Sequence, residues 1–260
     1  MTINPNGVFI WYELLTTDAD ASADFYSGVV GWQVAASGMP GMDYRLLMAG
    51  EAQVGGLMQL SQDMLDGGAL PVWLGYISVD DADGAVARIA AAGGKVQVPP
   101  TDIPNVGRFA MVADPQGIPI YVLHDQGQTP STAFAQGLDG HCAWNELETP
   151  DPKAALDFYG GQFGWKPGET MSMGEAGDYL MFELDGAPIG GMMQASPVGS
   201  SPMWRFYFRV PSLEAAMRRV RAGGGQVLHG PQPVPGDDEI ALGMDPQGAA
   251  FALVSRAVLD

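Results

Sequence analysis

Short apolar stretches alternate with amphipathic ones along the chain. Residues 8–15 are apolar and aromatic, which predicts a strand. Asp18 then suits a helix N-cap, and apolar residues recur after it at helical spacing as far as Val29. Gly31 ends this predicted helix, and three short strands are expected in the thirty residues that follow.

The same order of elements is predicted three more times. Residues 72–79 resemble a strand and residues 81–92 a helix. Asp151 followed by Pro152 is a strong helix start, and Ser212 suits the N-cap of a later helix. We therefore predict an α+β fold made of four βαβββ units.

The second half of the chain repeats the first. Three pairs of matching phrases occur in the same order: "DFYSGVVGW" at 24–32 with "DFYGGQFGW" at 157–165, "VGGLMQ" at 54–59 with "IGGMMQ" at 189–194, and "DPQG" at 114–117 and 245–248. Such a fixed order indicates an internal duplication. We expect two domains, residues 1–127 and 138–260, joined by a linker at about 128–137.

Composition narrows the range of partners. The chain has 12 basic and 30 acidic residues, a net charge of −18, which disfavours binding to nucleic acid or to an anionic membrane. The one cysteine, Cys142, excludes an internal disulfide and a cysteine-based zinc cage. The opening residues show no signal peptide, and no apolar run approaches the ~20 residues of a membrane helix. We expect a cytoplasmic protein.

The four units, the spacing D-x6-FY-x4-GW and the "DPQG" before the last strand of each half together resemble the vicinal oxygen chelate family. That family includes glyoxalase I, extradiol dioxygenases and bleomycin-resistance proteins. The resemblance covers nearly the whole chain, and "W-x-E-L" in the first strand is similar to bacterial two-domain glyoxalase-like proteins. It implies two tandem glyoxalase-like domains with cup-shaped mixed sheets.

The resemblance also implies where metal-dependent members hold their ion. The corresponding positions in this chain are Trp11, Leu74 and Tyr121 in the first half, and Trp144, Arg205 and Ala252 in the second. None of these side chains suits a divalent cation, which needs histidine and carboxylate ligands here. We therefore expect neither a metal nor another cofactor.

Alternation along the strands selects the candidate site residues. Glu13 and Glu146 lie within apolar strands, where a carboxylate is costly unless it is hydrogen-bonded. Each is a candidate catalytic base, or else a structural anchor, and we expect Glu146 to pair with Arg205 or Arg209. The candidate ligand-binding residues share the same face: Trp11, Tyr76, Tyr121, Trp144, Arg205, Tyr207 and Arg209.

Other repeated residues are assigned to the fold. Phe25 and Tyr26 are expected to pack the first helix on its sheet, and Trp73 and Trp204 are expected to point towards the helices. The "DPQG" phrase needs only turn chemistry.

Three functions remain open. The first is a metal-free protein that binds a small, partly aromatic organic molecule. The second is an enzyme: an isomerase, lyase or hydroxylase-like catalyst that uses a pocket glutamate as base, or a metal-dependent glyoxalase I or ring-cleaving dioxygenase, which the residues at the ligand positions oppose. The third is an interaction protein with closed cups. Because the halves can replace two subunits, we expect a monomer that mimics a dimer, or a homodimer.

Overall fold

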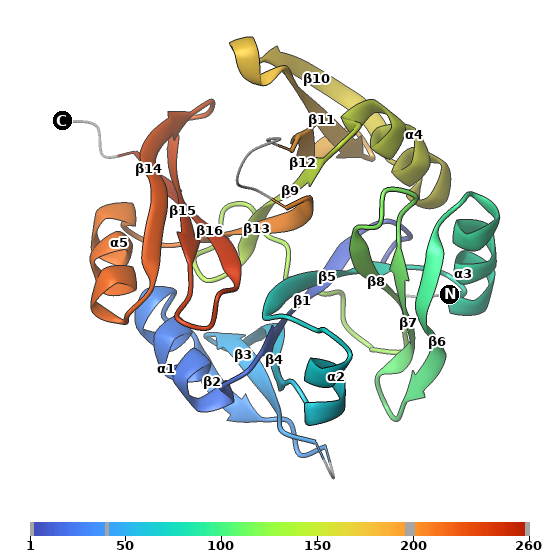
Figure 1. The fold of residues 1–260 in the computed structure, drawn as a ribbon, viewed down its shortest axis with the longest axis horizontal. Coiled ribbons are helices and arrows are strands. Elements are labelled where there is room, and N and C mark those ends of the chain that lie inside the picture. Colours follow the sequence, from blue (N-terminus) through green and yellow to red (C-terminus); the bar gives the residue numbers. More distant parts are fainter. Residues whose placement is uncertain (1–2, 40–41, 196–200, 258–260) are drawn as a thin grey trace. The chain divides into compact units, whose positions relative to one another are not determined.

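The computed structural model describes residues 3–39, 42–195 and 201–257 (Figure 1). The elements of the first half are β1 (Phe9–Thr16), α1 (Ala19–Val29), β2 (Gln33–Ala36), β3 (Tyr44–Ala49), β4 (Ala52–Gln59), α2 (Gln62–Asp66), β5 (Val72–Ser78), α3 (Ala82–Ala91), β6 (Lys95–Ile103), β7 (Gly107–Ala113) and β8 (Pro119–Asp125). Those of the second half are β9 (Cys142–Thr149), α4 (Pro152–Phe163), β10 (Lys166–Ser172), the 3-10 turn η1 (Gly174–Ala176), β11 (Asp178–Leu184), β12 (Ala187–Gln194), β13 (Met203–Arg209), α5 (Leu213–Ala222), β14 (Gln226–Val234), β15 (Asp238–Met244) and β16 (Ala250–Arg256).

Each half forms one eight-stranded mixed sheet. The strand orders are β2-β3-β4-β1-β5-β8-β7-β6 and β10-β11-β12-β9-β13-β16-β15-β14. In every βαβββ unit the first strand runs parallel to the last, as β9 does to β12, and the remaining strands pair antiparallel. Among the described strands, β2 and β6 are the edges of one sheet and β10 and β14 those of the other, so neither sheet closes into a barrel. The predicted α+β fold of four βαβββ units is confirmed.

Two compact units emerge from the packing, and each draws on both halves. One unit contains the segment that ends at Ile10, together with Leu74–Ser131 and Trp144–Arg205. The other contains Trp11–Trp73, Thr132–Ala143 and the segment that starts at Phe206. The second βαβββ unit of the chain therefore packs with the third, and the first packs with the fourth.

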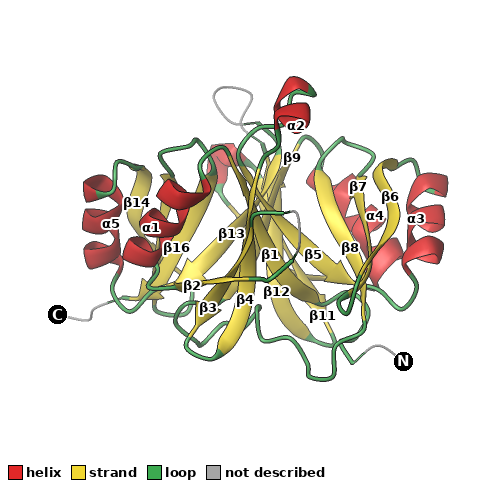
Figure 2. Cartoon of the chain, turned by 90° about the horizontal axis from the view of Figure 1, so that it is seen from below, coloured by secondary structure: helices red, strands yellow, loops and turns green. Residues whose placement is uncertain are grey.

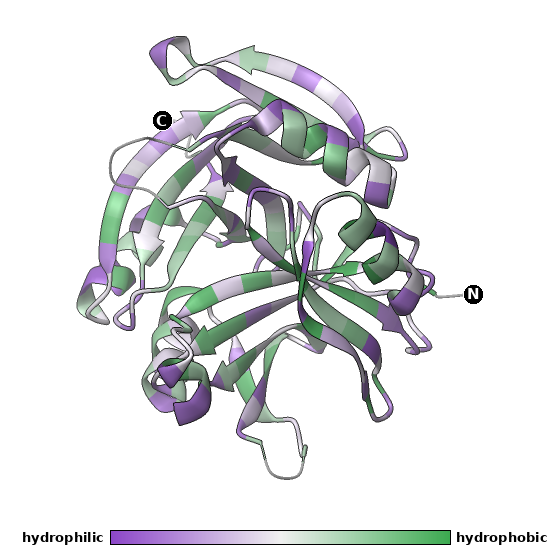
Figure 3. Ribbon diagram, turned by 45° about the vertical axis from the view of Figure 1, so that its right-hand side comes forward, coloured by the Kyte–Doolittle hydropathy of each residue, from purple (hydrophilic) through white to green (hydrophobic). Residues whose placement is uncertain are grey.

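The helices begin where the sequence predicts. Asp18, Asp151 and Ser212 are all N-caps, and their side chains accept hydrogen bonds from Ala21 N, Ala154 N and Ala215 N. Gly164 ends α4 in the left-handed conformation, with φ of 80°, which glycine adopts without steric cost. Within each compact unit a helix packs on neighbouring strands, as α5 does on β14–β16 and α3 on β6–β8 (Figure 2). In Figure 3 these helices carry both hydrophobic and hydrophilic residues, as amphipathic helices do.

A buried hydrogen-bonded chain holds each compact unit together. The Trp73 indole donates to Tyr26 Oη over 2.8 Å, and the Tyr26 hydroxyl donates to an Asp245 carboxylate oxygen over 3.0 Å. In the other unit, Trp204 donates to Tyr159 over 3.3 Å and Tyr159 to Asp114 over 3.2 Å. The expectation that Trp73 and Trp204 face the helices is confirmed.

The aspartate of each "DPQG" does more than the predicted turn chemistry. One oxygen of Asp245 accepts hydrogen bonds from the backbone N–H groups of Gln247 and Ala249, while the other binds Tyr26. Asp114 repeats this arrangement with Gln116, Ile118 and Tyr159. Burial raises the pKa of both carboxyls above its usual value, although these donors partly oppose the shift.

A few features differ from the sequence expectations. Helix α2 was not predicted. The expected linker is partly packed, since Ala133 is fully buried and Phe134 forms a β-bridge with Cys142. Among the described residues, none of the helices has the length and apolar character needed to cross a membrane.

Candidate ligand-binding site

The glycine pairs of "VGGLMQ" and "IGGMMQ" make room for a tyrosine on the sheet. A Cβ atom on Gly191 would lie 2.1 Å from Tyr179 Cε1, and one on Gly56 would lie 2.0 Å from Tyr44 Oη. Real Cβ atoms do not approach that closely, so the second glycine of each pair lets a tyrosine ring lie flat against the strand. Tyr44 begins β3 and Tyr179 lies at the start of β11, at equivalent places in the two halves.

Each tyrosine is held by a tryptophan that lies two strands away in the same sheet, on the first strand of the same βαβββ unit. Trp144 Nε1 donates to Tyr179 Oη over 2.7 Å, and Trp11 Nε1 donates to Tyr44 Oη over 2.8 Å. Both tryptophans are half-buried, so part of each indole stays accessible. The arrangement is therefore a duplicated aromatic pair on the sheet face opposite the helix.

In the second half the hydrogen-bonded chain continues into a cluster of charges. The Tyr179 hydroxyl donates to Glu146 Oε2 over 3.1 Å. Arg205 Nη1 donates to Glu146 Oε1 over 3.2 Å and also to Glu148 Oε1. The predicted pairing of Glu146 with Arg205 is thus confirmed, and Glu148 joins it as a second carboxylate.

This cluster is deeply buried. Glu146, Glu148 and Arg205 expose only 6%, 8% and 7% of their surfaces. Burial, reinforced by the negative charge of Glu146, raises the pKa of Tyr179 well above its ordinary value of 10.0. Tyr179 therefore stays protonated at neutral pH and acts as a hydrogen-bond donor to Glu146.

The first half keeps the glutamate but not the other charges. Glu13 is buried, with 4% of its surface exposed. Leu15 and Leu74, also buried, stand where the second half has Glu148 and Arg205. At these two equivalent positions the first half therefore has apolar side chains and the second half has charged ones.

The remaining predicted site residues are found in other environments. Tyr76 and Tyr121 stack on each other, with ring centroids 4.2 Å apart and planes inclined by 14°, and both are buried. Tyr207 is buried opposite Ala252 on the neighbouring strand. Arg209 donates to both oxygens of Asp238 and to the carbonyl of Gln136, so its described contacts are not with Glu146.

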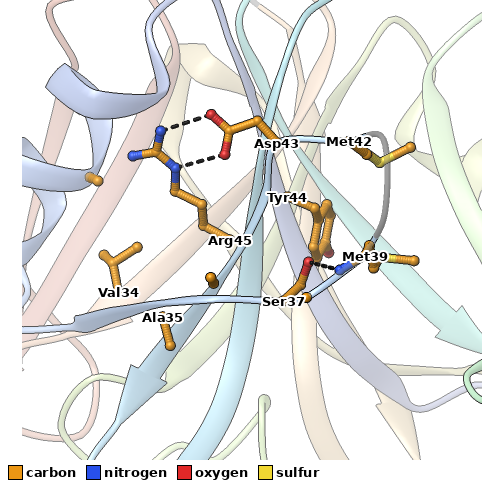
Figure 4. Close-up of a pocket in the computed structure, with 11 residues that line it drawn as sticks. Val34, Ala35, Ser37, Met39, Met42, Asp43, Tyr44 and Arg45 are labelled. Carbon is orange, nitrogen blue, oxygen red and sulfur yellow. Dashed lines mark hydrogen bonds and ion pairs between the residues drawn. The ribbon is translucent and has the colours of Figure 1, made fainter.

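A shallow hollow lies at the β2–β3 hairpin of the first half, and Tyr44 is one of the residues that line it (Figure 4). It measures about 480 Å³. Its lining consists of Ala23 and of described residues between Val34 and Arg45, among them Met39 and Met42. Arg45 is bound to Asp43 and to Asp20, each over 2.8 Å. These ion pairs raise the pKa of Arg45 and balance its charge, so the hollow offers less specific chemistry than the buried cluster.

Comparison of the sequence with known protein families gives a match that occurs once in each half. The family model of the Glyoxalase/Bleomycin resistance protein/Dioxygenase superfamily matches residues 9–122 and again residues 140–253. The chain belongs to this superfamily. The duplication and the βαβββ units are those of a tandem superfamily member.

Two relatives align with this superfamily member along almost their full lengths. A protein of Mycobacterium tuberculosis named "Putative glyoxylase CFP32" is 32% identical over 250 residues, covering 95% of this chain and 94% of that protein. Anthracycline biosynthesis protein DnrV of Streptomyces peucetius is 29% identical over 268 residues, covering 98% of this chain and 95% of that protein.

Solved structures confirm the superfamily fold. The Mn(II)-bound glyoxalase from Novosphingobium aromaticivorans aligns with a TM-score of 0.66 and 17% identity, over 98% of this chain and 83% of that one. The 2,2',3-trihydroxybiphenyl 1,2-dioxygenase from Sphingomonas wittichii strain RW1 aligns with a TM-score of 0.67 and 15% identity, over 100% and 93%. At such identities the likeness extends to the fold alone.

The residues at the superfamily's metal positions do not fit a metal ion. Arg205 places a guanidinium between two carboxylates in the second half, and Leu74 and Tyr121 offer a hydrocarbon and a stacked phenol in the first. Among the residues that the structure describes, no three His, Cys, Asp or Glu side chains come together as metal ligands. In the second half these side chains form an ion pair with each other instead of a set of metal ligands, so a metal-dependent reaction does not follow from them.

Tyr44 and Tyr179 are site residues that were not predicted from the sequence. A signal was present, because "DY" occurs at 43–44 and again at 178–179, in both cases eleven residues before a glycine pair. The sequence does not show that each tyrosine ring fills the space where a Cβ atom of the second glycine would lie.

Proposed function

We propose that this protein binds a small, partly aromatic organic molecule without the help of a metal. The proposed site is the sheet face on which Trp144 and Tyr179 lie. We name it the aromatic–methionine face, because three half-buried methionines from neighbouring strands alternate onto the same side: Met171, Met181 and Met193. The observation that carries the proposal is the half-buried Trp144 indole, held in place by Tyr179.

The chemistry of this face favours flat organic ligands. Tryptophan and tyrosine offer large rigid surfaces, and methionine adapts its flexible, polarisable side chain to irregular aromatic shapes. The buried cluster at one end supplies a few polar groups that can orient a ligand, as ligand pockets generally do. One relative is named for a glyoxylase and another for anthracycline biosynthesis, which agrees with a small-molecule ligand.

The contacts of Glu146 favour a positioning role over that of a general base. Its Oε1 accepts from Arg205 and its Oε2 from Tyr179, so each oxygen is already engaged by a donor. A general base must reach the proton that it removes, and both oxygens of Glu146 are already held by donors of the protein. For this reason we rank binding above catalysis.

We further propose that the protein acts in the cytoplasm as a monomer. The two halves supply the repeated units that separate subunits would otherwise contribute, and the one cysteine, Cys142, is a buried thiol that suits a reducing compartment. Light scattering of the purified protein tests the monomer, which a mass near twice 27.4 kDa would contradict.

The binding proposal is tested with a panel of two- and three-ring planar aromatic compounds. A ligand that binds the native state raises Tm in proportion to ln(1 + [L]/Kd). Trp144→Phe should abolish the ligand-induced change in tryptophan emission, because Trp144 is half-buried on the proposed face. Trp73→Phe, which alters a buried indole facing a helix, is the control for loss of stability alone. A panel without any Tm shift or emission change would overturn the proposal.

A further inference from the structure

We infer that the edge strand β2 is a docking site for an extended, basic peptide segment of another protein. The segment would add one strand to the sheet through backbone hydrogen bonds, a mode of recognition called β-augmentation. Strand β2 belongs to the compact unit that contains Trp11–Trp73, whereas the aromatic–methionine face lies in the other unit. This docking site is therefore separate from the proposed function and does not depend on it.

Strand β2 is an edge that the sequence leaves unprotected. The two described sheets have four edge strands: β2, β6, β10 and β14. Proteins commonly blunt such edges with proline, charged residues or bulges, because the open backbone groups can pair with another chain. β6, β10 and β14 each contain proline and shift register against the neighbouring strand. β2 has the sequence QVAA and pairs with β3 in one unbroken register.

The backbone groups of Val34 and Ala36 face the open side of this edge. Ser37 N donates to Tyr44 O over 3.2 Å, and residues of an antiparallel pair alternate between hydrogen-bonded and non-hydrogen-bonded positions. In the register of β2 with β3, the next hydrogen-bonded residue is therefore Ala35. Val34 and Ala36 occupy the alternate positions, so their N–H and C=O groups point away from β3.

The equivalent edge in the second half lacks this feature. Strand β10 follows Trp165 as β2 follows Trp32, so Val34 corresponds to Pro167. Proline has no backbone N–H, and the charged residue Lys166 precedes it. The fold thus tolerates a blocked edge at this place. The open edge of the first half is not a requirement of the fold, and pairing with another chain gives it a use.

The surroundings of β2 select the charge of the partner. The segment 18–51 has five acidic residues and one basic residue, Arg45, which gives a net charge of −4 (1 − 5). The side chain of Arg45 is 20% exposed, whereas those of its partners Asp20 and Asp43 are 89% and 51% exposed. The accessible charge is therefore negative and attracts a basic segment. A second copy of this chain would bring two such acidic surfaces together, which disfavours it as the occupant.

The length of β2 and the hollow beside it limit the size of the segment. Strand β2 has four residues, and residues on adjacent strands pair one to one. Ala35 and Ala36 are small and exposed, so a second backbone can approach closely. The hollow in Figure 4 is lined by Ala23 of α1 and by Val34, and it can take a partner side chain on the helix side of β2. We expect a short motif in which basic and apolar residues alternate.

Two acetylated and amidated peptides of opposite charge test the inference. The probe is KVTVK, and its control is EVTVE. We expect a two-dimensional NMR titration with KVTVK at low salt to shift the amide signals of Val34 and Ala36. EVTVE should bind about tenfold more weakly. Equal binding of the two peptides, no binding of KVTVK, or shifts that leave Val34 and Ala36 unchanged would overturn the inference.

A proline variant separates backbone pairing from charge attraction. Val34→Pro copies the second half, removes one outward donor and should weaken KVTVK binding about fivefold. The matched control Val34→Ala keeps the donor and should change the affinity by less than about twofold. KVTVK with its backbone amides N-methylated should also bind the natural protein more weakly, which tests the pairing if Val34→Pro fails to fold.

Two results of these experiments would contradict the inference. Binding that neither Val34→Pro nor N-methylation weakens would exclude pairing of strands. A dimer of the natural protein that Val34→Pro converts to a monomer would show that a second copy of the chain occupies the edge in place of a basic partner.

Discussion

The hydroxyl of Tyr26 donates a hydrogen bond to the carboxylate of Asp245, which lies 219 residues later in the chain. Tyr26 belongs to the phrase "DFYSGVVGW" and Asp245 to "DPQG". The equivalent bond joins Tyr159 to Asp114. Two phrases that look independent in the sequence are thus donor and acceptor of one bond, and each bond joins one half of the chain to the other.

Loss of this donor should destabilise the fold. Tyr26→Phe would leave the buried Asp245 charge without its hydroxyl partner, and we expect the free energy of unfolding to fall by about 2 kcal/mol in urea denaturation. Tyr159→Phe should cost a similar amount. The double variant should lose the sum, because the two bonds lie in different compact units. Unchanged stability in both single variants would show that the bonds contribute nothing.

The two aspartates should also give stability a particular pH dependence. Because burial raises the pKa of Asp245 in the folded state, its contribution is fully present below the unfolded value of about 3.9 and is lost as the pH rises through the folded value. Asp245→Asn keeps an oxygen for the backbone donors but cannot titrate. We expect the stability advantage of the natural protein over this variant to shrink between pH 4 and 7 in urea titrations; an advantage that grows with pH would contradict the direction of the shift.

Removal of Arg205 should be severe and partly reversible by a second change. Arg205→Leu, which copies Leu74, leaves two carboxylates buried without their guanidinium and should cost about 3–5 kcal/mol of unfolding free energy. Addition of Glu148→Leu, which copies Leu15, should restore much of that loss. A double variant as unstable as Arg205→Leu alone would show that the two residues are not coupled.

Gly191→Ala should displace Tyr179 and break its contacts with Trp144 and Glu146. The new methyl group would meet the ring at 2.1 Å, so we expect a loss of about 2 kcal/mol together with a change in Trp144 emission. The matched control is Gly161→Ala in α4, where a Cβ meets nothing within 4 Å and where alanine should be neutral or stabilising. Equal stability of the two variants would argue against the proposed packing of Tyr179.

Divalent metals should have no effect on the protein. Because Trp144, Arg205 and Ala252 stand at the superfamily's metal positions in the second half, we expect Tm to be the same with a chelator and with added Zn²⁺, Ni²⁺ or Mn²⁺. Elemental analysis of the purified protein checks this independently. A stoichiometric metal would overturn the metal-free proposal.

Features set by local spacing were predictable from the sequence, and features set by distant pairing were not. The caps at Asp18, Asp151 and Ser212 follow from residues that touch near neighbours. The pairing of Glu146 with Arg205 could be predicted because alternation puts both on one face of adjacent strands. Nothing in local spacing connects Tyr26 with Asp245, because their contact depends on which βαβββ units pack together.

The exchange of βαβββ units between halves has an evolutionary consequence. Two identical chains that assembled in this way would have to change both copies of a site at once, since every mutation would appear twice. Fusion into one polypeptide fixes the ratio of the copies at one to one and lets each diverge. One copy could then acquire Glu148 and Arg205 while the other held Leu15 and Leu74. A duplicated chain thus permits what a symmetric assembly does not: a change at one position that leaves the equivalent position of the other half as it was.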